Sequence, residues 1–234
     1  MLDHYFNRIY IINLKSRSDR RREMADELAR AGMSFDDSAV RLFSAVKPDD
    51  AGEFPSIGAR GCFLSHLGIL TDAAEGAAGP IAILEDDLEL AQDFATRAPA
   101  VLDALGEKSW SIFYGGYEAG SFEAEGLNLV PPDLGLRTTH FICFNGPAIA
   151  PAKKYLEAIL ARPAGDAQGG PMHVDGAYSW LRKDNREMAT YAAWPPLGNQ
   201  RRSRSDIAGP RWFDRMPGLN KAAAVARRLL RSQR

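Results

Sequence analysis

The 234-residue sequence lacks several features that mark secreted, disulfide-bonded or membrane-spanning proteins. It has two cysteines, Cys62 and Cys143, in apolar surroundings and without a metal-ligand pattern, so we expect buried free thiols in a reducing compartment. No apolar run approaches the roughly 20 residues of a membrane span. The first residues, 1–8, contain no basic leader followed by an apolar core, so no secretory signal is expected. Together these absences predict a cytoplasmic protein.

The chain as a whole also lacks an excess of either charge, since its net charge is −1. The charges are nevertheless unevenly distributed along it. Residues 198–234 hold ten Arg or Lys against two Asp, a net charge of +8, and the remainder carries −9. A basic amphipathic helix is expected within 220–234. It would bind an anionic membrane surface, at the inner face of the membrane, or alternatively pack as a solvated helix on the domain. No nucleic-acid partner is expected.

The stretch that is most informative about function is 80–90, Pro-Ile-Ala-Ile-Leu-Glu-Asp-Asp-Leu-Glu-Leu. The apolar run 81–84 fits one buried strand and leads directly into Glu85, Asp86 and Asp87. Adjacent carboxylates need water, a cation or several hydrogen-bond donors. Because ligands bind at the carboxyl ends of parallel strands, the cluster predicts a site for a hard divalent metal that carries a phosphorylated ligand. The alternative is an acidic loop that caps the next helix.

Strand and helix patterns alternate along the chain, which predicts one α/β layer structure with a mostly parallel sheet. Further strands are expected at 8–14, 40–44, 110–114, 138–144 and 188–194. Helices are expected from a cap at Ser16 or Ser18 to Gly32, and at 61–70, from Pro99 to Leu105, at 151–162 and from His173. Residues 117–133 indicate a loop or hairpin, and 163–171 a mobile loop.

The order of motifs resembles that of glycosyltransferase family 25, the lipopolysaccharide and collagen galactosyltransferase group. The matching stretches are Ile9-Tyr-Ile-Ile-Asn-Leu14 with Asp19-Arg20, Gly61-Cys62 with Ser65-His66, Ile83-Leu-Glu-Asp-Asp87, Thr139-His140 with Gly146, Val174-Asp175, and Pro195-Pro-Leu with Gln200 and Ser205-Asp-Ile207. One departure is Ala59-Arg60, where the family pattern has an acidic residue before the Gly-Cys pair. That difference bears on donor or acceptor preference more than on the chemistry.

The resemblance implies a GT-A fold and an inverting transferase that is specific for a nucleotide sugar. Asp87 would hold Mn²⁺ or Mg²⁺, with Glu85 or Asp86 contacting the ribose or serving as a second metal ligand. Asn13 would recognise the uracil and Arg20 a phosphate. The basic segment 15–22 around Arg20 is alternatively a solvated first helical turn.

The resemblance also places residues outside the acidic strand end in the site. Asp175 is the expected base that deprotonates the acceptor hydroxyl, and its alternative role is a helix N-cap. Ser65, His66 and His140 are expected to bind or position the nucleotide sugar, although a lone histidine such as His66 is also common as a hydrogen-bonded core residue. Two further residues, Gln200 and Ser205, would close over the diphosphate.

The implied function is transfer of a hexose, galactose, from a UDP-sugar to a hydroxyl of a lipooligosaccharide or polysaccharide acceptor. A catalytic domain would comprise residues 1–207 and a basic tail 208–234. Two rival interpretations remain open from the sequence. One is a nucleotidyltransferase, which also uses a strand-end carboxylate pair and a metal, and the other is a non-catalytic protein that keeps the nucleotide pocket.

Overall fold

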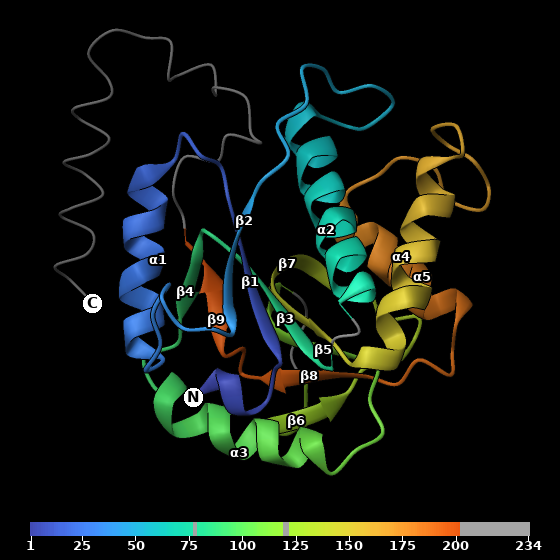
Figure 1. Cartoon of the computed structure of the whole chain (residues 1–234). Coiled ribbons are helices and arrows are strands. Elements are labelled where there is room, and N and C mark those ends of the chain that lie inside the picture. Colours follow the sequence, from blue (N-terminus) through green and yellow to red (C-terminus); the bar gives the residue numbers. More distant parts are fainter. Residues whose placement is uncertain (77–78, 119–121, 202–234) are drawn as a thin grey trace, which may run out of the picture. The chain divides into compact units, whose positions relative to one another are not determined.

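The computed structural model describes residues 1–76, 79–118 and 122–201. Its helices are η1 (Leu2–His4), α1 (Ser18–Arg30), α2 (Ile57–Glu75), α3 (Phe94–Gly106), α4 (Gly146–Leu160) and α5 (Val174–Asp184). Its strands are β1 (Arg8–Asn13), β2 (Val40–Ser44), β3 (Ile81–Glu85), β4 (Leu88–Leu90), β5 (Ile112–Glu118), β6 (Gly126–Leu129), β7 (Arg137–Phe144), β8 (Thr190–Trp194) and β9 (Gly198–Gln200). Figure 1 shows these elements along the chain.

The described strands form a seven-stranded sheet in the order β2-β1-β3-β7-β5-β8-β6, and a small antiparallel pair, β4-β9. In the large sheet β2, β1 and β3 are parallel, β7 runs antiparallel to both β3 and β5, and β8 is parallel to β5. Five of its strands therefore share one direction, and β7 and β6 run the opposite way. This confirms the predicted α/β class with a mostly parallel sheet.

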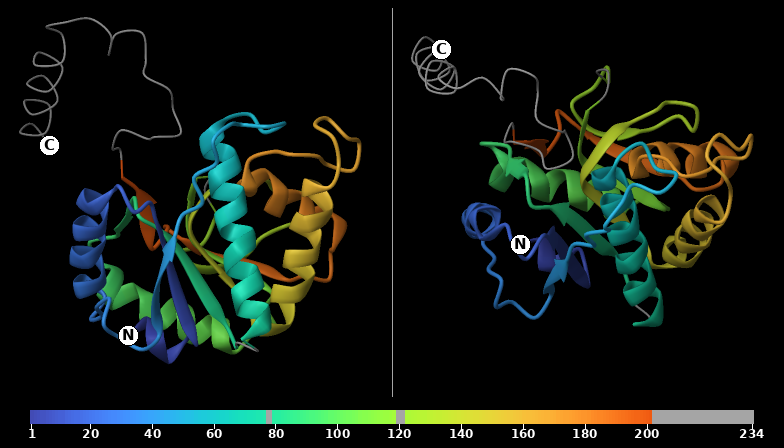
Figure 2. Two further views of the ribbon diagram at one scale, coloured as in Figure 1. Left: turned by 45° about the horizontal axis from the view of Figure 1, so that its top comes forward. Right: turned by 90° about the horizontal axis from the view of Figure 1, so that it is seen from above.

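Side chains from the two faces of the sheet enter two separate cores. Along β1, Tyr10 and Ile12 belong to the core that includes residues of α2, α4 and α5. Their neighbours Ile9 and Ile11 belong to the core that includes residues of η1, α1 and α3. The alternation follows the two-residue period of a strand, and the sheet lies between two helical layers (Figure 2).

Several element boundaries differ from the sequence prediction. The N-cap of α1 is Arg17, without a side-chain cap bond, and neither Ser16 nor Ser18 takes that position. Helix α3 begins at Phe94, five residues before Pro99, because Phe94 is buried and anchors an earlier turn in the core. Helix α4 begins at Gly146, since the Asn145 side chain accepts a hydrogen bond from the Gly146 N–H and caps it.

The largest difference in regular structure lies between Tyr117 and Asp133, where the sequence predicts a loop or hairpin. Strand β5 extends to Glu118, and β6 then pairs antiparallel with β8 at the sheet edge. The short strands β4 and β9 are not predicted, because three residues are too few for a periodic signal. Both border the acidic strand end, so they matter for the site.

The remaining predictions from the sequence concern membrane-spanning segments, the state of the cysteines and the domain boundary. Over the described ranges, no helix is long and apolar enough to cross a bilayer. Cys62 and Cys143 are both free thiols. Met1–Arg202 group into one compact unit. The predicted boundary at 207, the tail helix and Ser205 lie outside the described residues.

Candidate functional site

Four segments that are distant in sequence meet where β3 ends. Strands β1 and β3 are parallel, with Ile12 opposite Glu85, so their carboxyl ends lie at the same edge of the sheet. Antiparallel β7 brings its first residues to that edge, because Phe141 pairs with Leu84. The β4-β9 pair begins just beyond the strand end, with Leu88 opposite Gln200. The topology therefore surrounds the three carboxylates with polar groups from β1, β7 and β9.

Asp86 is held by the segment that follows β1. Its Oδ1 accepts a hydrogen bond from Arg20 Nη1 at 2.8 Å, and its Oδ2 accepts one from Asn13 Nδ2 at 2.7 Å. Asn13 Oδ1 in turn accepts from the Arg21 guanidinium at 3.3 Å. Asp86 and Asn13 are 8% and 2% exposed. Both carboxylate oxygens of Asp86 are thus bound within the chain, which makes Asp86 an anchor for Arg20 and Asn13.

Asp87 has weaker partners. Its Oδ2 accepts a hydrogen bond from Gln200 Nε2 at 3.1 Å and lies 3.7 Å from Arg20 Nη1. Its Oδ1 is buried and has no hydrogen-bond partner among the described residues. Burial, together with the negative charge of Glu85, raises the pKa of Asp87 to about 6, although Gln200 and Arg20 oppose the shift.

An unpartnered, buried carboxylate oxygen fits a hard divalent cation. A cation bound to Asp87 Oδ1 would supply the missing interaction and offset the repulsion from Glu85. A carboxylate oxygen of this kind is a suitable ligand for either Mn²⁺ or Mg²⁺, the two ions that the sequence predicts.

Glu85 faces away from Arg20, toward α2 and β7. Its Oε1 accepts a hydrogen bond from Thr139 Oγ1 at 2.8 Å and lies 3.6 Å from His66 Nε2 and 4.0 Å from Cys62 Sγ. Burial alone would raise the pKa of Glu85, but the nearby His66 ring and the hydrogen bond from Thr139 outweigh it and lower the pKa.

Burial also raises the pKa of the Cys62 thiol, as do the charges of Glu85, Asp175 and Asp87. Asp175 thus acts on the same sulfur as Glu85 and Asp87, which places the predicted base in the electrostatic surroundings of the acidic strand end.

The start of β7 connects His140 to the predicted base. His140 is 1% exposed, with Nε2 3.1 Å from the Gly198 carbonyl oxygen and Nδ1 3.0 Å from Thr138 Oγ1. A neutral ring with its proton on Nε2 satisfies both contacts, and burial lowers the pKa of His140 accordingly. Gly116 allows this packing, because a Cβ there would lie 2.5 Å from His140 Cδ2.

Asp175 lies in the first turn of α5 and contacts the same segment. Its Oδ2 accepts the Thr138 N–H at 2.9 Å, and its Oδ1 accepts the Gly176 N–H at 2.7 Å. Thr138 has a φ of 61°, in the left-handed region that a β-branched residue rarely adopts. Asp175 therefore holds a strained residue next to His140, and strain of this kind is concentrated at functional sites. It is not the N-cap of α5, since that position is His173.

Ser65 and His66, predicted to bind or position the nucleotide sugar, are both fully buried. Ser65 Oγ donates to the Gly61 carbonyl at 2.7 Å and accepts the Val46 N–H at 2.9 Å. His66 faces Glu85 through Nε2 and the Tyr178 hydroxyl through Nδ1, at 3.1 Å. These contacts favour positioning of the loop after β2 and of Glu85 over direct contact with a ligand, and the site role of Ser65 and His66 stays a prediction.

The structure adds residues that the sequence argument missed. Arg201 donates its backbone N–H to the Asp87 carbonyl oxygen at 2.6 Å, and its guanidinium pairs with Glu23 and Glu27 of α1. Thr139, Cys62 and Arg21 also take part in the site's polar contacts. Cys62 and Thr139 belong to the quoted motifs, and Arg21 and Arg201 stand next to motif residues, but nothing in the sequence shows which of these side chains point inward.

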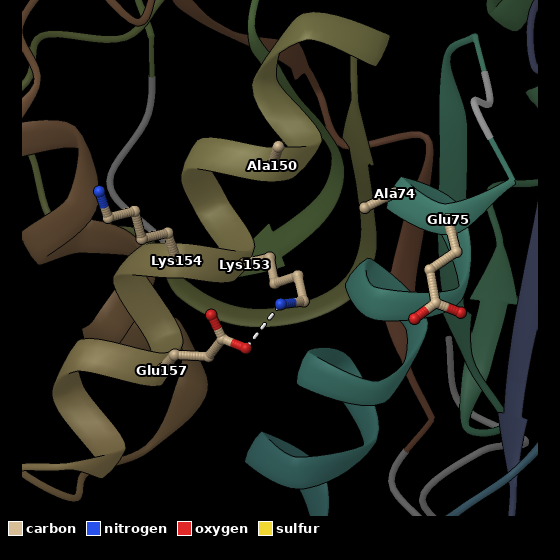
Figure 3. Close-up of a pocket in the computed structure, with 6 residues that line it drawn as sticks. All are labelled: Ala74, Glu75, Ala150, Lys153, Lys154 and Glu157. Atoms are coloured by element: carbon tan, nitrogen blue, oxygen red, sulfur yellow. Dashed lines mark hydrogen bonds and ion pairs between the residues drawn. The ribbon is translucent and has the colours of Figure 1, made fainter.

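A surface cavity of about 560 Å³ lies elsewhere, between the end of α2 and α4 (Figure 3). It is lined by Ala74, Glu75, Ala150, Lys153, Lys154 and Glu157. It lies near the amino ends of the parallel strands, opposite to the acidic strand end. Asp72, in the same last turns of α2, pairs there with Arg8 at the start of β1. Its two lysines and two glutamates balance in charge, and none of the predicted site residues lines it.

Comparison with known proteins gives the family. The sequence profile of glycosyltransferase family 25 (LPS biosynthesis protein) matches residues 6–131, which is more than half of the chain. The chain belongs to glycosyltransferase family 25. The matched range includes Asn13, Arg20 and the whole acidic strand end, but Asp175, His140 and Gln200 lie beyond it.

Two curated relatives show what members of this family are like. Procollagen galactosyltransferase 1-B of Xenopus laevis is 28% identical over 127 residues, covering 47% of this chain and 21% of that protein. Inactive glycosyltransferase 25 family member 3 of Homo sapiens is 28% identical over 138 residues, covering 51% of this chain and 23% of that protein. The chain thus matches only about a fifth of the length of these relatives. One is named a galactosyltransferase and the other is named inactive.

A solved structure shows the fold. The crystal structure of a glycosyltransferase involved in the glycosylation of the major capsid of PBCV-1 aligns with a TM-score of 0.50 at 13% identity, covering 85% of this chain and 94% of that one. At this identity the similarity concerns the fold alone. It agrees with the GT-A type of nucleotide-sugar-binding α/β fold that the motifs of this family 25 member predict.

Proposed function

We propose that this family 25 member is a metal-dependent, inverting glycosyltransferase that moves a hexose, galactose in the first instance, from a UDP-sugar to a hydroxyl of a lipooligosaccharide or polysaccharide acceptor. The observation that carries the proposal is Asp87, a buried carboxylate with an unpartnered oxygen beside Arg20 and Gln200 at the end of β3. A metal at Asp87, with Glu85 as a further ligand, would neutralise the diphosphate leaving group.

The chain's own residues then bind and orient the donor. Arg20 is held by Asp86 at the helix start that follows β1, where a guanidinium can pair with a phosphate. Asn13, at the end of β1, is hydrogen-bonded to Asp86, and the uridine is expected to bind beside this pair. Gln200 approaches Asp87 from β9, and Ser205, a few residues further on, is proposed to contact the diphosphate. His140, neutral and buried, positions Thr138 and β9 around this site.

Asp175 is the proposed general base. Its two oxygens accept backbone N–H groups, which orients the carboxylate and leaves lone pairs free to take a proton from the acceptor hydroxyl. Its charge contributes to the raised pKa of Cys62, whose sulfur contacts Glu85 at the end of β3. A base acts mainly in the transition state, so Asp175→Asn is expected to lower kcat by about 10²–10⁴-fold while donor affinity changes little.

The test begins with a thermal-shift screen of UDP-sugars with and without Mn²⁺, followed by an assay of UDP release. Asp87→Ala is expected to abolish transfer and to remove the metal-dependent gain in donor binding, and Asp175→Asn to keep that gain and lose turnover. Unchanged nucleotide affinity and turnover in Asp87→Ala would remove the metal assignment. Full turnover in Asp175→Asn would assign the base elsewhere.

The relative named inactive supports one alternative, a protein that binds the nucleotide sugar without transferring it. Metal-dependent binding of a UDP-sugar with neither transfer nor hydrolysis identifies that case. Release of pyrophosphate instead of UDP identifies the nucleotidyltransferase that the acidic strand end also permits.

We further propose that the tail, residues 208–234, docks the enzyme on an anionic membrane surface that presents a glycolipid acceptor. The support is the sequence: Lys and Arg alternate with small apolar residues within 220–234, and each basic residue near an anionic leaflet contributes about 1 kcal/mol. Co-sedimentation with anionic and neutral vesicles at two salt concentrations compares the full chain with a truncation before Asn220. Equal sedimentation of the two with anionic vesicles would contradict the role of the tail.

A further inference from the structure

A second cluster of metal-binding side chains lies behind the acidic strand end. Cys62 and His66 are four residues apart on α2, so they lie on one face of the helix, and that face meets Glu85 at the end of β3. Their ligand atoms, Cys62 Sγ, His66 Nε2 and a Glu85 carboxylate oxygen, all lie within 4.8 Å of one another. Across the ranges that the structure describes, no other group of three such residues is gathered in this way.

The contacts between these atoms are long. Glu85 Oε1 lies 3.6 Å from His66 Nε2, whereas an N–H···O bond spans about 2.7–3.2 Å, and it lies 4.0 Å from Cys62 Sγ, at the long end for an S–H···O hydrogen bond. His66 Nε2 is buried, in a side chain that is 0% exposed, and has no hydrogen-bond partner within the described residues. A buried donor that is left unpartnered costs about 1–3 kcal/mol, so this arrangement needs an explanation.

The same distances suit a shared tetrahedral cation. With bonds of about 2.3 Å to sulfur and 2.0–2.1 Å to nitrogen and oxygen, the ligand atoms around Zn²⁺ are about 3.3–3.6 Å apart. The two separations from Glu85 Oε1 exceed these edges by about half an ångström or less, and Cys62 Sγ and His66 Nε2 lie within 4.8 Å of each other, so side-chain rotations can close the site.

The outer contacts of the cluster also fit a metal site. His66 Nδ1, which faces away from the cluster, lies 3.1 Å from the Tyr178 hydroxyl. Thr139 Oγ1 donates to Glu85 Oε1 at 2.8 Å and fixes its orientation. Metal-binding histidines and carboxylates commonly have such supporting partners, which set the tautomer and the aim of each ligand.

We propose that Cys62, His66 and Glu85 bind a Zn²⁺-type cation, with water in the fourth position. Thiolate and imidazole ligands favour Zn²⁺ or Co²⁺ over the Mn²⁺ or Mg²⁺ that suits Asp87, so this site differs in chemistry from the proposed donor site, with which it shares the Glu85 side chain. The ion joins α2 to the end of β3 and fixes Glu85. The inference rests on these side chains alone and does not require the chain to be a transferase.

The probe is Co²⁺, added to the metal-free full-length protein under anaerobic conditions, because a thiolate ligand gives Co²⁺ a charge-transfer absorption in the near ultraviolet. We expect the band at one Co²⁺ per chain and its displacement by Zn²⁺. Cys62→Ala should remove the band, and Cys143→Ala, which removes the only other thiol of the chain, should keep it. A band kept by Cys143→Ala assigns the thiolate to Cys62 even if Cys62→Ala does not fold.

Two further variants give graded outcomes. Tyr178→Phe should keep the band and weaken Zn²⁺ binding by roughly 10–100-fold, since it removes only the outer partner of His66. Asp87→Asn should keep the band, whatever its effect on transfer. A wild-type protein without a thiolate band, or a band that survives Cys62→Ala, would overturn the proposal. Loss of the band in Asp87→Asn would also overturn it, because a single acidic site would then account for the cation.

Discussion

Asp87 and Asp86 are adjacent carboxylates with opposite surroundings, and neutralising each one should have opposite effects on stability. Asp87→Asn removes a charge that the fold opposes, because burial and Glu85 raise the pKa of Asp87 to about 6 from an ordinary 3.8. The amide oxygen can still accept from Gln200. We therefore expect Asp87→Asn to stabilise the metal-free protein near neutral pH, although the same change should abolish transfer.

The size and sign of this effect follow from proton linkage. Well below pH 3.8 Asp87 is protonated in both the folded and unfolded states, so it contributes no penalty. Between pH 4 and pH 6 the folded state holds the proton more tightly, and the free energy of unfolding falls as pH rises. A shift of the pKa from 3.8 to about 6 lowers the free energy of unfolding by about 3 kcal/mol above pH 6. This is an upper value, because Asp87 lies close to other carboxylates.

The measurement is urea unfolding in EDTA at pH 4.5 and pH 8, for wild type and Asp87→Asn. The stabilisation by the variant should be small at pH 4.5 and reach about 1–3 kcal/mol at pH 8. Saturating Mn²⁺ at pH 8 should stabilise wild type by about 2.7 kcal/mol at 100 times its Kd and leave the variant unchanged.

Asp86→Asn is the matched control. Asp86 binds Arg20 at 2.8 Å and Asn13 at 2.7 Å, so its neutralisation should destabilise the protein at pH 8 by about 1–3 kcal/mol. If Asp87→Asn is no more stable than wild type at pH 8, or if its gain is equal at the two pH values, the electrostatic argument for a cation at Asp87 fails.

Two further substitutions test the packing that supports the site. Gly116→Ala would place a Cβ 2.5 Å from His140 Cδ2, so it should cost about 1–3 kcal/mol in urea unfolding, whereas Gly106→Ala, with nothing within 4 Å, should gain about 0.5–1 kcal/mol. Equal stability of the two glycine variants would show that β5 does not pack against His140 as described. Ser65→Ala leaves the Val46 N–H without its acceptor and should cost about 1–3 kcal/mol, and a variant as stable as wild type would mean that this bond is not buried in solution.

The sequence alone determined the class of the fold and where its acidic centre lies. The apolar run 81–84 followed by three carboxylates predicts a buried strand with a polar end, because the sequence changes there abruptly from apolar to charged residues. The same local signal located β1, β2 and β7 within a residue or so. The order of the motifs along the chain indicates the family, and the family profile confirms it over residues 6–131.

Only the tertiary structure decided what each carboxylate does. Glu85, Asp86 and Asp87 are consecutive, yet they face His66 with Thr139, Arg20 with Asn13, and Gln200, respectively.

These partners come from segments more than 50 residues away in most cases, so no local pattern reveals them. Cys62 shows the same limit, because its sequence neighbours give no metal-ligand pattern until β3 brings Glu85 to the face of α2. Spacing along the chain predicts which side chains share an element, but packing between elements decides which ones meet.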